Sequence, residues 1–148
     1  MHTIFLPPFV VVMSIGIMVL LHVKIPVAEL LTQPLNWLGL VLVAIGFAMA
    51  SWHARLFRRI GTNINTFGKP GKLTREGLFR RTRNPMYLGM VIFLTGVACI
   101  LGSVSPLIGP LVFFLLAQYW YIPLEEKAMY QKFGDEYLDY QRAVPRWL

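Results

Sequence analysis

Cysteine and charge are both scarce in this sequence of 148 residues. The single cysteine, Cys99, excludes a disulfide within the chain and a cysteine-ligated metal cluster. Charged residues make up 14% of the chain and hydrophobic residues 56%, whereas soluble domains carry about 25% charged residues. Long stretches have no charge at all, and this segregation indicates a membrane protein rather than a soluble one. The sequence also lacks a zinc triad, a phosphate-binding glycine-rich loop and a nucleophile elbow, so we expect no metal site.

The charge that is present is mostly basic and concentrated in one segment. The chain has a net charge of +7, and the stretch from Arg55 to Tyr87 holds nine Lys and Arg residues against one acidic residue, Glu76. A basic balance of this kind is also typical of nucleic-acid binding. Polybasic segments beside apolar spans are, however, what the positive-inside rule places in the cytoplasm, where they attract anionic lipids. We therefore attribute the charge to topology and expect no nucleic-acid partner.

Four apolar runs predict an all-α polytopic membrane protein, a single domain over residues 1–148. The runs cover residues 4–23, 35–57, 87–101 and 106–123, and a helix needs about 20 apolar residues to cross the bilayer. The third run is short for a full crossing. Four spans put both termini on the side of the basic loop. We therefore expect a multi-pass protein of the bacterial inner membrane, with both termini, the basic loop and the tail in the cytoplasm.

The connection between the third and fourth runs carries the main spatial prediction. Residues 102–105 are Gly-Ser-Val-Ser, and such a short link forces an antiparallel helical hairpin. The hairpin brings the polar segment 73–89, before the third helix, close to the polar segment 124–147, after the fourth. Phe133-Gly134 should break the last helix, and its aromatic tail residues suggest a segment lying on the membrane surface; these are Tyr137, Tyr140 and Trp147.

Several residues in these two segments suit ligand chemistry. Asn84-Pro85 is typical of a helix start, with Asn84 as N-cap and Pro85 in the first turn, and a helix N-terminus favours anionic groups. Arg83 adjoins this cap and could pair with a carboxylate. Glu125 and Glu126 stand at the end of a span, where carboxylates are costly and often functional. One could bind a cationic amine or ribose hydroxyls while the other pairs with Arg83. A plain helix cap and a solvated acidic pair remain the alternatives.

The combination of segments resembles a known family. RNPMYLG, preceded by LTREGLF and followed by the hairpin, LEE, FGDEYLDY and VPRW, is similar to the C-terminal region of isoprenylcysteine carboxyl methyltransferases and their bacterial relatives. Phospholipid N-methyltransferases and sterol reductases carry a related arrangement. The resemblance covers residues 63–147, and it implies a cytosolic site for S-adenosylmethionine (SAM). The family often has His at position 84 and Tyr at position 79, where this chain has Asn84 and Phe79.

Carried over by position, the resemblance implies specific site residues. Tyr121 stands where the eukaryotic enzymes have an arginine implicated in substrate binding, so Tyr121 is the candidate substrate-binding residue. Because that arginine is missing here, a prenylcysteine carboxylate is disfavoured as the substrate. Arg83, Tyr87 and Glu126 are the candidate catalytic residues, with Glu126 or Tyr87 as base if one is needed. The implied cofactor-binding residues are Gly71, Lys72, Leu73, Thr74, Phe79, Asn84, Pro85, Met86, Tyr87 and Glu125.

These features predict an integral membrane SAM-dependent methyltransferase acting on a small hydrophobic or lipid-like acceptor. Methylation of a carboxylate oxygen is the preferred prediction, because an ionised carboxylate needs no base. N- or S-methylation stays open. An NADPH-dependent reductase of the sterol reductase kind and a non-enzymatic scaffold or lipid-binding protein are the alternatives. Membrane lipids and a second copy of the chain are the candidate partners.

Overall fold

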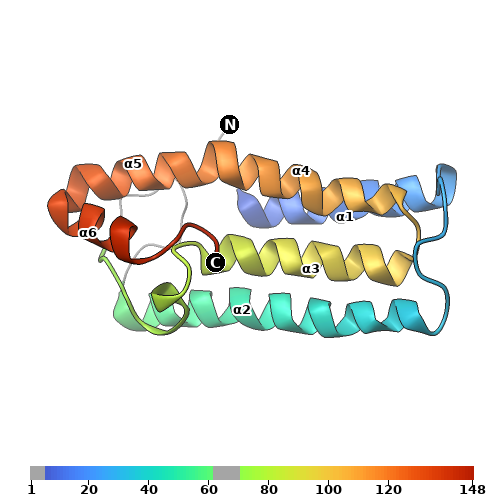
Figure 1. Ribbon diagram of the computed structural model, residues 1–148, viewed down its shortest axis with the longest axis horizontal. Coiled ribbons are helices and arrows are strands. Elements are labelled where there is room, and N and C mark those ends of the chain that lie inside the picture. The colour runs from blue at the N-terminus through green and yellow to red at the C-terminus, as the bar shows by residue number, and fades with distance from the viewer. Residues whose placement is uncertain (1–5, 62–70) are drawn as a thin grey trace.

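The computed structural model describes residues 6–61 and 71–148, and over these ranges it is helical with no strand. The helices are α1 (Pro7–Lys24), α2 (Gly39–Ile60), α3 (Pro85–Leu101), α4 (Ile108–Leu116), α5 (Ile122–Phe133) and α6 (Asp135–Ala143). Single 3-10 turns at Leu35–Leu38, Gly77–Arg80 and Ser105–Leu107 precede α2, α3 and α4. Helices α4 and α5 run on through the turn Ala117–Tyr121, so Ser105–Phe133 forms one long rod (Figure 1).

Three of these helical segments are long and apolar enough to cross a membrane, namely Pro7–Lys24, Leu35–Ile60 and Ser105–Phe133. Helix α3 is apolar but shorter, as the sequence predicted. The predicted all-α membrane architecture is thus confirmed. One end differs slightly, because α2 continues to Ile60, three residues past the predicted run, whereas α3 begins at Pro85, as the Asn84-Pro85 pair predicts. Residues 4 and 5 of the first predicted span lie outside the described residues.

Glycines let α2 and α3 pack backbone against backbone. A Cβ added at Gly46 would lie 2.5 Å from the Phe93 nitrogen, and one added at Gly96 would lie 2.6 Å from the Gly39 carbonyl oxygen. Because Gly39 meets Gly96 and Gly46 meets Gly89, the two helices run antiparallel in a fixed register. This close approach is the usual way membrane helices associate. It fixes the position of the α3 N-terminus, which carries the polar site.

The hairpin between α3 and α4 is formed as predicted. Gly102 ends α3 with a left-handed backbone (φ 78°), and the Ser105–Leu107 turn leads into α4. Leu94 and Ala98 of α3 pack with Phe113 of α4 in a fully buried core, and Met18 of α1 completes it. In Figure 1, α3 lies between α2 and the α4–α5 rod, with α1 beside α4. The start of α3 and all of α5 therefore lie toward the same end of the bundle.

The rod contains one irregular turn, at Ala117–Tyr121. This turn is π-helical, and Pro123 follows it as the second residue of α5. Proline has no N–H to donate to the carbonyl four residues earlier, so a widened turn just before it relieves the mismatch. The turn sets the direction in which Tyr121 and the first residues of α5 project. Sequence analysis did not predict it.

Candidate active site

The two polar segments that flank the hairpin converge at one end of the bundle. Arg83 Nη1 donates a 2.8 Å hydrogen bond to Glu126 Oε1, linking the entry of α3 to α5 across 43 residues of sequence. Tyr87 Oη donates a 2.7 Å hydrogen bond to Glu125 Oε1. The predicted meeting of these segments, and the pairing of Arg83 with one of the two glutamates, are therefore confirmed.

Glu126 is held by two arginines. Besides the bond from Arg83, its Oε1 accepts from Arg146 Nε at 3.1 Å and its Oε2 accepts from Arg146 Nη2 at 2.5 Å. The side chains of Arg83 and Glu126 are 12% and 16% exposed, so the ion pair is largely shielded from water. Arg83 also approaches Tyr137 Oη, at 3.4 Å, while its Nε is buried with no acceptor among the described residues. In this cluster one carboxylate therefore accepts hydrogen bonds from two guanidinium groups, and the Nε–H of Arg83 has no acceptor among the described residues.

Tyr87 joins the polar site to the apolar core. Its ring is 1% exposed and lies parallel to the ring of Tyr121, with centroids 5.8 Å apart and an interplanar angle of 2°. Tyr121 projects from the π-helical turn, so that irregular turn supplies the second ring of the stack. The Tyr87 hydroxyl then reaches Glu125, one turn further along the rod. One buried aromatic stack therefore orients a carboxylate at the end of a membrane-spanning helix.

The last residues of the chain make hydrogen bonds both to the start of α3 and, through Arg146, to α5. Thr82 Oγ1 and Asn84 Nδ2 both donate to the Arg146 carbonyl, at 3.1 and 2.9 Å, and the Arg83 N–H donates to the Pro145 carbonyl at 3.0 Å. Asn84 does stand at the N-cap position and Pro85 does begin the helix. The Asn84 side chain makes no capping hydrogen bond, however, because its amide is turned toward the C-terminal segment. The predicted capping role of that side chain is wrong.

The basic loop packs on α6 beside this cluster. Lys132 Nζ donates to the Gly71 carbonyl at 2.8 Å, Leu73 packs against Tyr137 and Tyr140, and Tyr140 Oη donates to the Phe79 carbonyl at 2.8 Å. The rings of Tyr137 and Tyr140 do not face lipid, because both are buried against protein, while the position of the tail on the membrane surface stays a prediction.

Both α6 tyrosines titrate above their usual range. Burial, reinforced by the nearby Glu126 charge, raises the pKa of Tyr137, although Arg83 opposes the shift. Burial likewise raises the pKa of Tyr140. Both phenols therefore stay protonated at physiological pH and act as hydrogen-bond donors.

Comparison with known proteins identifies the family. The model of the phospholipid methyltransferase family matches residues 35–136, more than two thirds of the chain. The chain belongs to the phospholipid methyltransferase family. Over 63 residues it is also 36% identical to an uncharacterized protein of Haemophilus influenzae, an alignment that covers 43% of this chain and all of that protein. No solved structure matches it.

Membership in the phospholipid methyltransferase family makes this chain a membrane methyltransferase. The family match contains α2, α3 and α5, and so includes the Tyr87–Glu125 and Arg83–Glu126 contacts. It confirms the resemblance drawn from the sequence. The sterol-reductase and non-enzymatic alternatives find no support in it.

Not every predicted site residue lies in the same cluster. Phe79 is buried on the other side of α3, where its ring stacks on Phe57 of α2 with centroids 5.7 Å apart and also contacts His53. Met86 packs at the edge of the apolar core. Residues 63–70 of the predicted cofactor-binding region lie outside the described residues.

Two residues that complete the candidate site were not predicted from the sequence. Arg146 was noted only as part of VPRW, yet it contributes most of the contacts to Glu126. Trp147, expected on the membrane surface, instead donates to Gln118 Oε1 in the π-helical turn at 2.7 Å and packs on Phe114. The available signal was the arginine of VPRW itself, which lies in the segment predicted to approach the start of α3.

Proposed function

We propose that this protein transfers a methyl group from SAM to a small hydrophobic or lipid-like acceptor at the membrane surface. The observation that carries the proposal is the convergence of the Tyr87–Glu125 and Arg83–Glu126–Arg146 contacts at one end of the hairpin. By the positive-inside rule this basic end faces the cytoplasm, where the cofactor is available. The same rule places both termini in the cytoplasm, in keeping with a bacterial inner-membrane protein.

The residues present fit SAM, which carries an ammonium, a carboxylate, ribose hydroxyls and an adenine ring. Glu125 offers a carboxylate to the ammonium or the ribose hydroxyls. Arg83 Nε is buried without an acceptor among the residues the structure describes, and a buried N–H of this kind suits the cofactor carboxylate. Gly71 lies beside Lys132 at the same end of the molecule, with Lys72 and Thr74 close to it in sequence, whereas Phe79 is buried against Phe57 of α2 and would have to move before its ring could contact the adenine.

When bound, SAM supplies a methyl group already activated by the positive sulfur. The protein then has to align the acceptor, the methyl and the sulfur, and alignment alone can lower a barrier by roughly 7–11 kcal/mol. Tyr87, stacked on Tyr121, holds the Glu125 carboxylate in one orientation. Both oxygens of Glu126 already accept hydrogen bonds from guanidinium groups, so in this proposal Glu126 positions Arg83 and is not a base.

Methylation of a carboxylate oxygen fits this arrangement best, because an ionised carboxylate needs no base and Glu126 is occupied. A phospholipid amine is the second candidate, which the description of the family favours. In either case the apolar part of the acceptor reaches the site laterally from the bilayer. Tyr121 lies at the bend in the rod where such a molecule would pass, so we assign it to substrate binding.

The direct test is to incubate the purified protein with SAM carrying a labelled methyl group and a total membrane lipid extract, and to find the labelled product by mass spectrometry. NADPH in place of SAM tests the reductase alternative in parallel. We expect labelled lipid with SAM, a loss of about tenfold or more in rate for Glu125→Gln, and an unchanged rate for Glu76→Gln, which alters only an exposed ion pair with Arg59. No labelled product, or equal rates in both variants, would contradict the proposal.

A further inference from the structure

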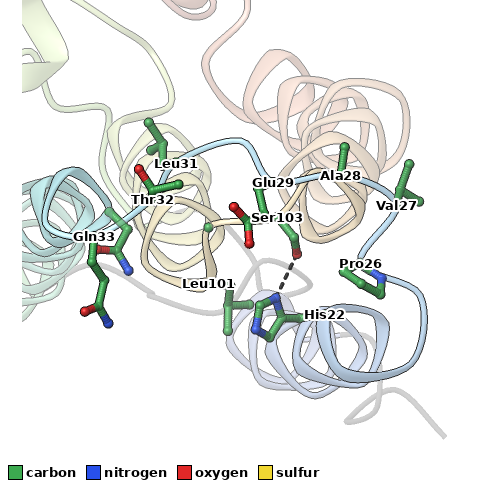
Figure 2. A pocket seen from close by; sticks show the side chains of 12 residues that line it. His22, Pro26, Val27, Ala28, Glu29, Leu31, Thr32, Gln33, Leu101 and Ser103 are labelled. Carbon is green, nitrogen blue, oxygen red and sulfur yellow. Dashed lines mark hydrogen bonds between the residues drawn. The ribbon is translucent and has the colours of Figure 1, made fainter.

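A polar pocket lies at the end of the bundle opposite the Tyr87–Glu125 site. It has a volume of about 480 Å³, is open to one side, and is lined by the last turn of α1, the loop 26–33 and the turn between α3 and α4 (Figure 2). Clefts of about 300–1,000 Å³ are the usual size of small-ligand sites. The methyl-transfer chemistry proposed above makes no use of this pocket.

One wall of the pocket groups a carboxylate, a hydroxyl and an imidazole. Glu29 pairs with Ser103 in an isolated antiparallel bridge, and Ser103 Oγ is hydrogen-bonded to His22 Nδ1 at 2.8 Å. Figure 2 shows these three side chains coming from the loop, the α3–α4 turn and α1. Segments distant in the sequence are thus held together around an acidic group.

A second acceptor in the lining is left unpaired. Asn36 Nδ2 donates to the Ile100 carbonyl at 3.1 Å, which fixes the amide so that Oδ1 is buried with no donor in the described part of the chain. Buried acceptors are normally satisfied, and a ligand donor is one way to satisfy this one. Together with the Glu29 carboxylate it gives the pocket a preference for a ligand rich in N–H donors, such as a primary ammonium.

The charges at this end have a simple pattern. In the sequence, Lys24 and Glu29 are the only formal charges between His22 and His53, and residues 84–124 carry none. One positive and one negative group, at opposite ends of a six-residue segment, match a zwitterion better than a simple anion or cation.

The surroundings of the pocket are apolar and face outward. Val23, Ile25, Val27, Leu30 and Leu35 are between 46% and 74% exposed. Because α1 is an 18-residue apolar helix that ends at Lys24, this rim lies where acyl chains give way to lipid headgroups. A polar pocket inside an apolar rim is suited to an amphipathic ligand whose head enters the pocket and whose chains cover the rim.

The loop that closes the pocket is held in a rare conformation. The Ala28 N–H donates to the Pro26 carbonyl at 2.8 Å across Val27, whose φ is 64°. This is a γ-turn of the uncommon hand, and a β-branched residue is unfavourable in it. Such strain persists where neighbouring contacts fix the backbone, often around ligands. Here Leu30 and Leu31 N–H groups bind the Gly102 carbonyl and hold the loop over the hairpin turn.

We propose that this pocket binds the headgroup of a zwitterionic aminophospholipid, with the ammonium on Glu29 and the phosphate near Lys24. The site is independent of methyl transfer, since it lies at the other end of the bundle. Binding of this one lipid would hold the pocket end of the protein at the outer leaflet of the bilayer.

The test is native mass spectrometry of the full-length protein released from detergent, titrated separately with phosphatidylethanolamine and phosphatidylglycerol of identical acyl chains. We expect phosphatidylethanolamine to bind about tenfold more tightly, a difference of about 1.4 kcal/mol. Glu29→Gln should abolish this preference, whereas Glu76→Gln, at the other end of the molecule, should keep it. Glu29 is exposed, so its substitution should leave the fold intact, and the thermal unfolding midpoint of each variant checks this.

Two further arms separate the explanations. Phosphoethanolamine without acyl chains should bind at least about a hundredfold more weakly, and equal binding would show that the ligand is a soluble zwitterion and overturn the lipid assignment. Equal affinity for the two lipids, or a preference that survives Glu29→Gln, would also overturn it. Glu29→Gln should leave SAM binding unchanged, so a failure here is distinguishable from a failure of the proposed function.

Discussion

At the scale of single residues, Glu126 organises the candidate site because its carboxylate pairs with two guanidinium groups in a largely shielded position. We predict that Glu126→Gln lowers the free energy of unfolding by about 3 kcal/mol, since removing one partner leaves uncompensated charge in a poorly solvated place. Glu76→Gln is the matched control. It breaks the pair with Arg59, whose side chains are 69% and 55% exposed, and should cost less than about 1 kcal/mol.

The measurement is unfolding of both variants in mixed detergent micelles, followed by circular dichroism. Similar losses for Glu126→Gln and Glu76→Gln would mean that the Arg83–Glu126–Arg146 cluster is as solvated as a surface pair, contrary to its burial.

Because of Tyr140, we expect the free energy of unfolding to decrease at alkaline pH. Burial raises the pKa of Tyr140 above the usual value near 10, so the unfolded chain loses this proton first as the pH rises. The free energy of unfolding contributed by this group is fully present below about pH 10 and decreases above it. Tyr140→Phe should lower the melting temperature at pH 8, because the bond to the Phe79 carbonyl is lost, but flatten its decline between pH 9 and 11.

Melting temperatures of wild type, Tyr140→Phe and Tyr130→Phe over this pH range provide the check. Tyr130 is half exposed and serves as control. If the melting temperature declined equally steeply in Tyr140→Phe and wild type, Tyr140 would not be the cause of the alkaline loss of stability.

Individual roles were predictable from sequence only where opposite charges could be matched. Arg83 and the glutamate pair stand at the two ends of a hairpin, so their contact followed from the turn. The Arg146 contact did not, because it depends on how the last residues fold back over Thr82 and Asn84 after α6. The amphipathic pattern of α6 was visible, but whether Tyr137 and Tyr140 face lipid or the loop at Leu73 is decided by tertiary packing.

At the scale of helices, the α2–α3 contact is the most sensitive element of the fold. Gly46→Ala places a methyl group 2.5 Å from the Phe93 nitrogen, and neither backbone can move without displacing the α3 entry. We predict a loss of about 1–3 kcal/mol of stability. Gly16→Ala in α1 is the control, because nothing lies within 4 Å of its Cβ position, and helix propensity alone favours alanine there.

Unfolding of the two glycine variants in detergent tests this packing, with Gly16→Ala expected at or above wild-type stability. If Gly46→Ala were equally stable, the helices would not be in backbone contact.

The helices themselves were predictable because long uncharged runs and the Gly102 turn leave little choice in a bilayer. The end of α2 moved by three residues, since Arg58 can continue a helix, whereas the start of α3 followed from the Asn84-Pro85 pair. The π-helical turn was not predictable, because it results from Pro123 within a helix whose continuation depends on its packing. Sequence alone does not decide whether Gly39 and Gly46 face another helix or lipid, because the answer depends on their partners in α3.

At the scale of the whole molecule, the account requires the basic end and the Glu29 pocket to face opposite sides of the membrane. We predict that, in a Cys99→Ala background, Val27→Cys reacts in intact cells with a maleimide that cannot cross the inner membrane, whereas Glu76→Cys reacts only after the membrane is permeabilised. Both positions are exposed, so access to the reagent decides the outcome. The reverse pattern would place the candidate active site outside the cytoplasm.

The most direct test of the central claim is calorimetric titration of SAM into the purified protein, because convergence of the two polar segments has to produce one cofactor site. We predict saturable binding by wild type, weakened about tenfold or more by Glu125→Gln and by Tyr87→Phe, and unchanged in Glu76→Gln. Absence of binding by the folded wild-type protein, or affinities for Glu125→Gln and Tyr87→Phe equal to that of Glu76→Gln, would contradict the account.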